Sequence, residues 1–437
     1  MTVSQAPHPS VAALLQGSGR VPQAPHAWLN ARRGAALERA NALSVPTTRD
    51  EEWRFTDVSP LTRVAFHTAQ GATRVAPADL ASLRIPEATI HLTFIDGVFA
   101  RELSSAHGLA EGVIVTDLAS ALDARSAELE PHLAKLAHYE RDVFVALNTA
   151  WLHDGAYIRV AGDRVCDGPV HLLFVSTQKE TVSHPRTLIV LEPGAQATVV
   201  EEYVALDAAD TYFSNAVTEV VVHENACLRH AKLQREARGA FHIGQCAVAL
   251  AKDARYESDT VTLGARISRN DIRVVQQGEG AECRIDGLTL IGGRQLADTH
   301  TAIEHAQPNG RSRQLNKCIV ADAAHAVFNG KILVRPGAQL TDSAQQSRNL
   351  LLSAKAHVDT KPQLEIFADD VKCAHGATVG QLDPEQLFYL RSRGLAEARA
   401  RNLLTYAFGA EVIDRLPVAS LVERLERVVL EQTQTPE

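Results

Sequence analysis

The chain has 437 residues, of which 45% are hydrophobic and 22% charged, and its formal net charge is -8. A chain of this size can bury a large core, and we expect more than one structural unit. Basic and acidic residues are mixed along it without a basic stripe for phosphates, so we expect no nucleic-acid partner. No run reaches the roughly 18 apolar residues of a membrane span, and residues 1–16 lack the features of a signal peptide, so we expect a cytoplasmic protein with no membrane partner.

Six cysteines are spread along the chain without any Cys-X-X-Cys pair. This spacing excludes a zinc knuckle and a four-cysteine cluster motif. In a reducing cytosol we expect free thiols, most of them acting as small buried apolar side chains.

The first expected unit, residues 1–148, mixes helices with strands. Residues 25–43 carry apolar side chains such as Trp28 and Leu37 among charged ones and end before a proline, which predicts an amphipathic helix. A second helix is predicted over residues 117–137, which are rich in Ala, Leu and Glu.

The second expected unit, residues 149–380, has the pattern of stacked strands. Short apolar runs such as residues 170–176 and 217–222 are bounded by Gly, Pro, Asp or Asn, and helical periodicity is nearly absent. A turn followed by Ala and a strand recurs at loose spacing, which indicates the coils of a solenoid. A parallel β-helix and a β-sandwich both fit these runs, and the recurrent turns favour the β-helix.

Helical signals return in the third expected unit, residues 381–437. Asp383 is followed by Pro384 and Gln386, which is the sequence of a helix N-cap, a first helical position and a capping box. Two further helices are predicted. The last begins at Pro417 and carries an apolar stripe at spacings of three and four, so it needs a surface to pack against.

Cys373 and His375 form the most informative candidate site. Residues two apart on a strand share one face, so the thiol and the imidazole would point the same way and could contact one metal ion. A thiolate and an imidazole suit iron or zinc, but two protein ligands do not close a site. Further ligands would have to come from elsewhere.

A second group of candidate ligands consists of Asp298, His300, Glu304 and His305. Scattered histidines and acids near turns are usually solvated, so we expect no metal there. The chain also lacks the Gly-X-X-X-X-Gly-Lys-Ser/Thr sequence of a phosphate loop, so any ATP hydrolysis must belong to a partner.

A series of segments in one order resembles the SufB/SufD family and, within it, the SufD branch. The matching segments are residues 51–57 (EEWRFTD), 328–331 (FNGK), 345–352 (QQSRNLLL), 359–366 (DTKPQLEI), 370–380 (DVKCAHGATVG) and 387–394 (LFYLRSRG). The Gly-Ala-Thr that follows His375 favours SufD, because a Glu commonly follows this histidine in SufB. The resemblance covers most of the chain and is weakest over residues 60–150.

This resemblance implies a mainly β fold, in which a right-handed parallel β-helix core is flanked by an N-terminal α/β region and a C-terminal helical segment. It implies a scaffold subunit of the SUF iron–sulfur cluster assembly system, working in a SufBCD complex and not as an enzyme. The implied partners are a SufB-like subunit and a SufC-like ABC ATPase. No cofactor is expected to be permanently bound, only transient iron or an iron–sulfur cluster in the complex.

The resemblance also assigns roles to residues. His375 and, more weakly, Cys373 are the expected ligands for cluster assembly at the SufB interface. Phe388, Leu403 and Leu404 are the expected contacts of the C-terminal helices to the ATPase, unless they pack only on the β-helix.

Three alternatives remain open. The chain could be a purely structural subunit without a metal-ligand role. The isolated chain could pair as a homodimer, because a β-helix leaves strand edges and flat faces exposed. A β-helix carbohydrate-active enzyme is the third alternative, but it would need clustered acids and aromatic platforms that the sequence does not display.

Overall fold

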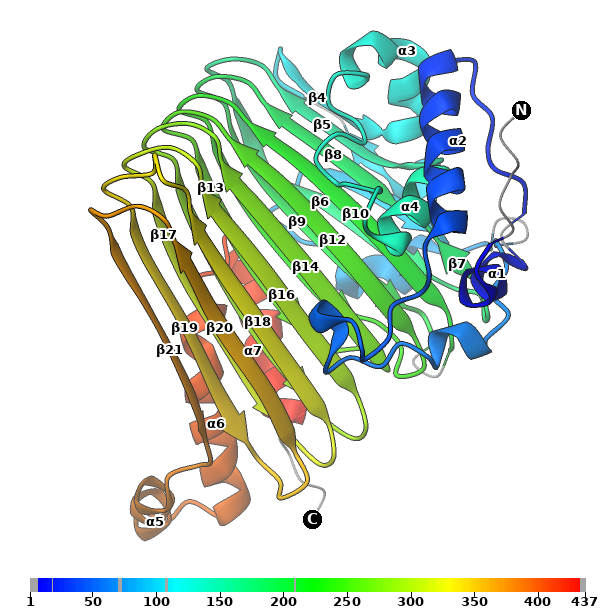
Figure 1. The fold of residues 1–437 in the computed structure, drawn as a ribbon. Coiled ribbons are helices and arrows are strands. Elements are labelled where there is room, and N and C mark those ends of the chain that lie inside the picture. Colours follow the sequence, from blue (N-terminus) through cyan, green and yellow to red (C-terminus); the bar gives the residue numbers. More distant parts are fainter. Residues whose placement is uncertain (1–6, 18, 70–72, 107–108, 208–209, 433–437) are drawn as a thin grey trace.

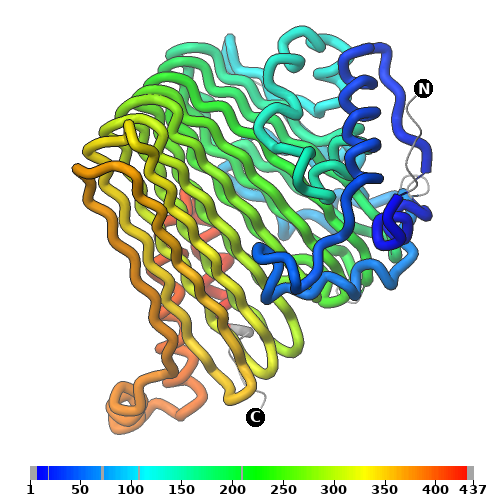
Figure 2. Tube along the Cα trace, in the orientation of Figure 1, coloured from blue at the N-terminus to red at the C-terminus, as the bar shows by residue number. Residues whose placement is uncertain are grey.

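The computed structural model describes residues 7–17, 19–69, 73–106, 109–207 and 210–432 (Figure 1). Its centre is a long stack of strands that pass back and forth between two sheets, as the continuous trace shows (Figure 2). Helices from the two ends of the chain lie outside this stack. The predicted mainly β fold with a parallel solenoid is confirmed.

Each sheet can be followed strand by strand from one end of the solenoid to the other. The first has 11 strands: β2 (Val98–Phe99), β1 (Ile90–Ile95), β6 (Val165–Ser176), β9 (Gln196–Ala205), β11 (Cys227–Arg235), β13 (Arg255–Thr262), β15 (Glu282–Ile291), β17 (Arg311–Val320), β19 (Asp342–Leu351) and β21 (Lys372–Gly380), with β3 (Ser105–Ala106) paired to β1. The second has 10: β20 (His357–Ile366), β18 (His325–Val334), β16 (Leu296–His305), β14 (Ile267–Gln276), β12 (Phe241–Leu250), β10 (Phe213–Val222), β8 (Arg186–Leu191), β5 (Gly155–Val160) and β4 (Val113–Asp117), with β7 (Val182–Ser183) paired to β10.

From β8 onward, consecutive long strands alternate between the two sheets, so each coil contributes one strand to each. In the second sheet all neighbours from β8 to β20 are parallel and pair without a register shift. This in-register stacking of successive coils is the arrangement of a solenoid. It decides between the two folds that the strand pattern allowed, because the strands of a β-sandwich are mainly antiparallel.

The recurrent turn followed by Ala marks the corners of the coils. Ala226 and Ala254 are completely buried. The residues before them, Asn225 and Asp253, have left-handed φ angles of 57° and 55°. Asn and Asp adopt this conformation more readily than other non-glycine residues, and the small Cβ of Ala fits the tight inner corner.

Aliphatic side chains fill most of the solenoid interior, in agreement with an aromatic content of only 5%. In the first coils, three rings at equivalent positions form a stack. Phe94 lies 4.8 Å from Phe174, and Phe174 lies 4.7 Å from Tyr203, with the ring planes nearly parallel. Parallel registry therefore converts like residues on successive coils into continuous columns.

The N-terminal region folds into helices and short strands beside the first coils. Its helices are α1 (Pro9–Leu15), α2 (Ala27–Ala42), α3 (Leu118–Leu129) and α4 (Val143–Ala150), with short 3-10 helices η1 (Glu51–Trp53), η2 (Leu61–Arg63), η3 (Pro77–Leu83) and η4 (Arg101–Leu103). The helix predicted over residues 25–43 is confirmed by α2. The second predicted helix begins as expected after Asp117, whose side chain accepts the Ser120 N–H at 2.8 Å. It ends at Leu129, before residue 137, because Pro131 has no backbone N–H with which to continue the helical hydrogen bonds.

Short antiparallel strands close the first end of the solenoid. β4 runs antiparallel to β5, and β2 and β3 run antiparallel to β1. Helix α3 lies over this end and packs Leu118 and Leu122 in one cluster with Tyr157 and Leu188.

The C-terminal segment forms α5 (Pro384–Ser392), α6 (Glu397–Ile413) and α7 (Ala419–Gln432). The Asp383 side chain accepts the backbone N–H of Glu385 at 2.9 Å, as the predicted N-cap requires. In the apolar stripe of α7, Leu421, Leu425 and Val429 are fully buried in a cluster with Leu288 and other residues of the first sheet, and Val422 and Val428 pack partly buried against it. The outer face of that sheet is therefore the surface that the stripe packs against.

None of the described helices combines the length and the apolar character needed to cross a membrane. In the stretch from residue 1 to 16, for which no signal peptide is expected, residues 1–6 lie outside the described part of the chain. The remainder includes α1, which buries Val11 and Leu14.

Candidate functional site

The candidate site lies on the last coil, formed by β20 and β21 at the edges of the two sheets (Figure 1). In the described part of the chain, β20 pairs only with β18, and β21 pairs only with β19. Their residues are half-buried or exposed, whereas β18 is mostly buried. The solenoid thus ends in an uncovered coil that leaves backbone N–H and C=O groups along both edges.

Cys373 and His375 lie on β21, opposite Ser343 and Gln345 of β19. Alternation along the strand puts both on the face that continues the solenoid interior, since Ser343 and Gln345 are buried. Cys373 is half-buried and packs on an apolar cluster that includes Val334, and burial raises the pKa of its thiol. His375 is exposed and is therefore the more accessible donor of the two.

A row of polar side chains leads through the interior towards His375. Gln345 donates a hydrogen bond to Oε1 of Gln314 at 2.7 Å, and Gln314 donates to Oγ1 of Thr301 at 2.8 Å. At the end of this row is an open groove of about 330 Å³, lined by residues 344–348 and 374–378. The end of the solenoid therefore offers polar contacts beside the imidazole.

The last coil offers two side chains of the kinds that bind metal ions. One imidazole and one half-buried thiol supply two donors, whereas a tetrahedral iron or zinc site needs four. The raised thiol pKa keeps Cys373 protonated near neutral pH and makes it the weaker ligand. The uncovered edge leaves room for further ligands from a second chain.

The three predicted partner contacts lie on the C-terminal helices and differ in exposure. Phe388 on α5 is 73% exposed, and its neighbour Tyr389 is 56% exposed. Leu403 on α6 is 43% exposed, while Leu404 is half-buried. Helix α5 has no buried residue and projects beyond the stacked strands (Figure 1).

The second group of predicted ligands does not form a site. Asp298 is buried, with its carboxylate 2.5 Å from Arg269 and 3.0 Å from His300. Glu304 forms an ion pair with an arginine of the next coil, and His305 is buried and contacts a serine hydroxyl. The expectation that these residues are solvated is wrong for Asp298, His300 and His305, which are all buried. Asp298 accepts a hydrogen bond from Thr56 and His300 pairs with Glu52, so the N-terminal region covers both side chains. His305 lies on the opposite face of the strand, in the interior.

A buried charged pair that the sequence did not predict lies inside the solenoid. The Glu201 carboxylate accepts hydrogen bonds from Thr218 and Tyr203 at 2.8 Å and lies 3.2 Å from Nε2 of His230. Burial disfavours both charges, but the contact with His230 outweighs it and lowers the pKa of Glu201 to about 2. Hydrogen bonds to Cys246 and Glu201 likewise raise the pKa of His230 to about 10. No local pattern reveals this pair, because it joins different strands.

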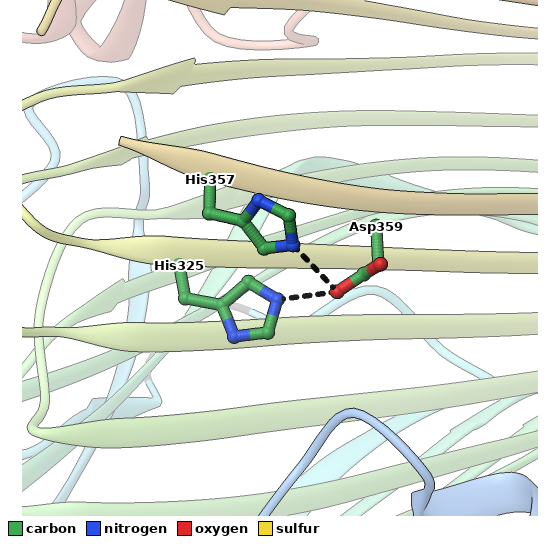
Figure 3. A group of neighbouring side chains, drawn as sticks. All are labelled: His325, His357 and Asp359. Carbon is green, nitrogen blue, oxygen red and sulfur yellow. Dashed lines mark hydrogen bonds and ion pairs between the residues drawn. The ribbon is translucent and has the colours of Figure 1, made fainter. Parts of the chain in front are cut away.

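A second group that the sequence did not predict lies on the outer surface of the second sheet, where His325 of β18 converges with His357 and Asp359 of β20 in the uncovered coil (Figure 3). One signal could have identified it. Each histidine directly follows the small corner residue of its coil, Ala324 or Ala356. Two coils with the same sequence at the same corner place their histidines side by side.

The fold and the last coil define the chain as a parallel β-solenoid protein that carries a thiol and an imidazole on one uncovered end. Residues 174–408 match the family described as "SUF system FeS cluster assembly, SufBD core domain", and residues 16–172 match the "SufBD protein N-terminal region". The chain belongs to the SufB/SufD family of iron–sulfur cluster assembly proteins.

Individual relatives agree with this assignment. The chain is 40% identical over 411 residues to an iron–sulfur cluster assembly SufBD family protein of Synechocystis. The aligned part covers 92% of this chain and 90% of the relative. It is 35% identical over 386 residues to the iron–sulfur cluster assembly protein SufD of Escherichia coli, with 87% of each chain covered. SufD of Bacillus subtilis is 29% identical over 420 residues, with 92% and 93% covered. The resemblance to SufD is thus confirmed, and these comparisons give no support to a carbohydrate-active enzyme.

Proposed function

We propose that this chain is a SufD-like scaffold subunit of a SufBCD complex and supports iron–sulfur cluster building at an interface with a SufB-like subunit. His375 is the principal ligand donor at that interface. The observation that carries the proposal is the uncovered last coil, which presents His375 between two free strand edges. Iron and sulfide would be cargo held between two chains, and no cofactor would be permanently bound.

The uncovered coil favours a protein partner. Strand edges with free backbone groups are templates for pairing with another chain. Large apolar side chains are exposed near these edges, namely Ile366 (39%), Phe367 (60%) and Val379 (49%). A partner that adds strands to β20 and β21 would cover these groups and bring its own ligands beside His375. In the absence of SufB, the same edge would support a homodimer.

The two donors on β21 suit different roles. A neutral imidazole binds iron, and an imidazole can also carry protons during cluster formation. The thiol of Cys373 is half-buried and has a raised pKa, which favours a weaker or structural contribution.

The C-terminal helices supply the second half of the proposal, which is docking of a SufC-like ATPase. The buried faces of α6 and α7 cover the first sheet, so their packing on the solenoid is already satisfied. Phe388 and Leu403 remain exposed on the outer side and, with half-buried Leu404, form the proposed contact surface. This chain has no phosphate loop, so ATP hydrolysis belongs to the partner.

Co-expression of the chain with SufB-like and SufC-like subunits tests the ligand role. The His375→Ala complex should elute with wild-type stoichiometry on gel filtration but lack clusters by absorbance and iron analysis. The matched control is His138→Ala, since His138 is also exposed and, among the described residues, lies 3.9 Å from one partner carboxylate, that of Glu140. If His375→Ala complexes carry wild-type amounts of cluster, the ligand role is wrong and a purely structural subunit remains.

Point variants test the docking surface better than a truncation, because removing α7 would uncover the apolar face that Leu425 covers. The double variant Phe388→Ser with Leu403→Ser should lose the ATPase on co-purification and keep the SufB-like subunit. Val98→Ser is the matched control, since Val98 is 51% exposed at the opposite end of the first sheet. Retention of the ATPase by the double variant would place its interface elsewhere.

A further inference from the structure

Three side chains on the outer surface of the second sheet converge on one point (Figure 3). His325 begins β18 and His357 begins β20, and the two residues are register partners in the parallel ladder. Asp359 lies two residues after His357 and therefore on the same face of β20. The intervening positions, Ala326 and Val358, pack into the solenoid core, so the three side chains face outwards.

The donor atoms are spaced as a metal site requires. Oδ2 of Asp359 lies 2.8 Å from Nε2 of His325 and 3.2 Å from Nε2 of His357, and all three donor atoms lie within 4.8 Å of one another. With metal–ligand bonds of about 2.0–2.2 Å, the donors of a tetrahedral site stand about 3.3 Å apart. The 3.2 Å separation is close to this value, and the 2.8 Å separation would have to lengthen on metal binding. The third can shorten by rotation of the His357 ring, whose side chain is 64% exposed.

The backbone under these donors is held in place. The N–H of His325 donates to Gln295 O at 2.9 Å, and the N–H of His357 donates to Ala324 O at 3.1 Å. Both histidines are thus fixed at the same corner of adjacent coils. An ion can still reach the donors, because the side chains of His325 and Asp359 are about one quarter exposed.

The stability gained from ion pairing alone does not account for the convergence of these three side chains. Partly exposed ion pairs contribute little stability, about 0–1 kcal/mol. Moreover, two imidazoles with ring centroids 4.9 Å apart share a single carboxylate oxygen. If both rings were protonated, they would repel each other, whereas two neutral rings and a carboxylate can share one cation without conflict.

We propose that His325, His357 and Asp359 bind one divalent first-row transition-metal ion, such as Zn²⁺ or Fe²⁺. Two imidazole nitrogens and one carboxylate oxygen are a ligand set that both ions accept, and it leaves at least one coordination position open. The site is separate from the proposed role of His375, which lies in the other sheet, on β21. It therefore does not depend on the proposed function.

The test uses the full-length chain after treatment with a chelator and removal of the chelator. Calorimetric titration with Zn²⁺ should give one saturable site per chain, and Co²⁺ should develop the visible absorption of a four- or five-coordinate ion. His325→Ala and Asp359→Asn should each weaken binding by at least about tenfold, since even loss of a residue that only supports a ligand costs about 10–100-fold.

Two control variants locate the ion. His138→Ala should bind Zn²⁺ like wild type, because among the described residues His138 pairs with Glu140 and belongs to no group of three possible donors. His375→Ala should also bind like wild type, whatever its effect on cluster assembly. Circular dichroism checks that every variant is folded. The proposal is overturned if wild type shows no saturable Zn²⁺ binding, if His325→Ala and Asp359→Asn bind normally, or if only His375→Ala loses the ion.

Discussion

The carboxylate of Glu219 connects the N-terminal region to the outer face of the second sheet. One oxygen, Oε2, lies 2.7 Å from Nη2 of Arg186, and both side chains are completely buried. Together the two oxygens also accept four backbone N–H groups, those of residues 134–137, at 2.7–3.0 Å. Burial disfavours the charge, but Arg186 and these N–H groups outweigh it and hold the pKa of Glu219 below its ordinary value.

The substitution Glu219→Gln changes little volume but removes the charge and replaces one acceptor oxygen by an NH₂ group. Either orientation of the amide points that group at existing donors, and the Arg186 guanidinium is left buried without a counter-charge. Removal of one partner from a buried ion pair costs about 3–5 kcal/mol. We therefore expect the free energy of unfolding to fall by about that amount.

Urea unfolding at pH 7, followed by tryptophan fluorescence, measures the free energy of unfolding in the region that Glu219 holds. Trp28 and Trp53 lie in the N-terminal region, and Trp151 directly follows α4 and packs in one cluster with its residues. The control is Glu51→Gln, which removes an exposed partner of Lys361 and should cost at most about 1 kcal/mol.

A second variant separates the orphaned charge from other effects of the substitution. Adding Arg186→Met to Glu219→Gln removes the unpaired guanidinium and should recover part of the loss. A cost below about 1 kcal/mol for Glu219→Gln alone would refute the argument, because such values belong to solvated pairs. So would a double variant less stable than the single one.

Three further predictions concern the interior, the C-terminal helices and the last coil. The pKa of His230 is raised from 6.5 to about 10, so its contribution to stability is complete below pH 6.5 and is lost as the pH rises towards 10. Urea titrations across this pH range should show a steeper loss of unfolding free energy with pH for wild type than for His230→Gln. Equal slopes would contradict the pairing with Glu201. Leu425→Ala should cost about 2–5 kcal/mol and speed hydrogen exchange in α7, and unchanged exchange would mean that the stripe is not tightly packed. Cys373→Ala should leave more cluster in the co-expressed complex than His375→Ala, and the reverse order would make the thiol the main ligand.

Local patterns predict the repeating part of the fold well. The turn followed by Ala is visible in the sequence because corner residues such as Asn225 and Ala226 obey local rules of φ angle and size. The cap at Asp383 and the stripe of α7 are also local, and the structure contains both helices. The predicted end of α3 at residue 137 is wrong. Residues beyond Pro131 have a composition that favours a helix, but the proline ends α3 before them.

Contacts between coils were beyond prediction from local patterns. Glu201 and His230 come from different strands, and only the parallel register brings them together in the interior. The same holds for His325 and His357, whose contact depends on the number of residues in one coil. Cys373 and His375 could be predicted to share one face because they are two residues apart on a strand. The sequence did not reveal that their coil is the uncovered one.

The two ends of the solenoid are unequal, and this inequality limits the size of any assembly. Short antiparallel strands and α3 close the first end, while β20 and β21 leave the last end open. If two chains join through their open ends, each uses the uncovered coil and presents only a closed end to a third. Growth therefore terminates at a pair, and a higher protein concentration increases the number of pairs without lengthening them into filaments.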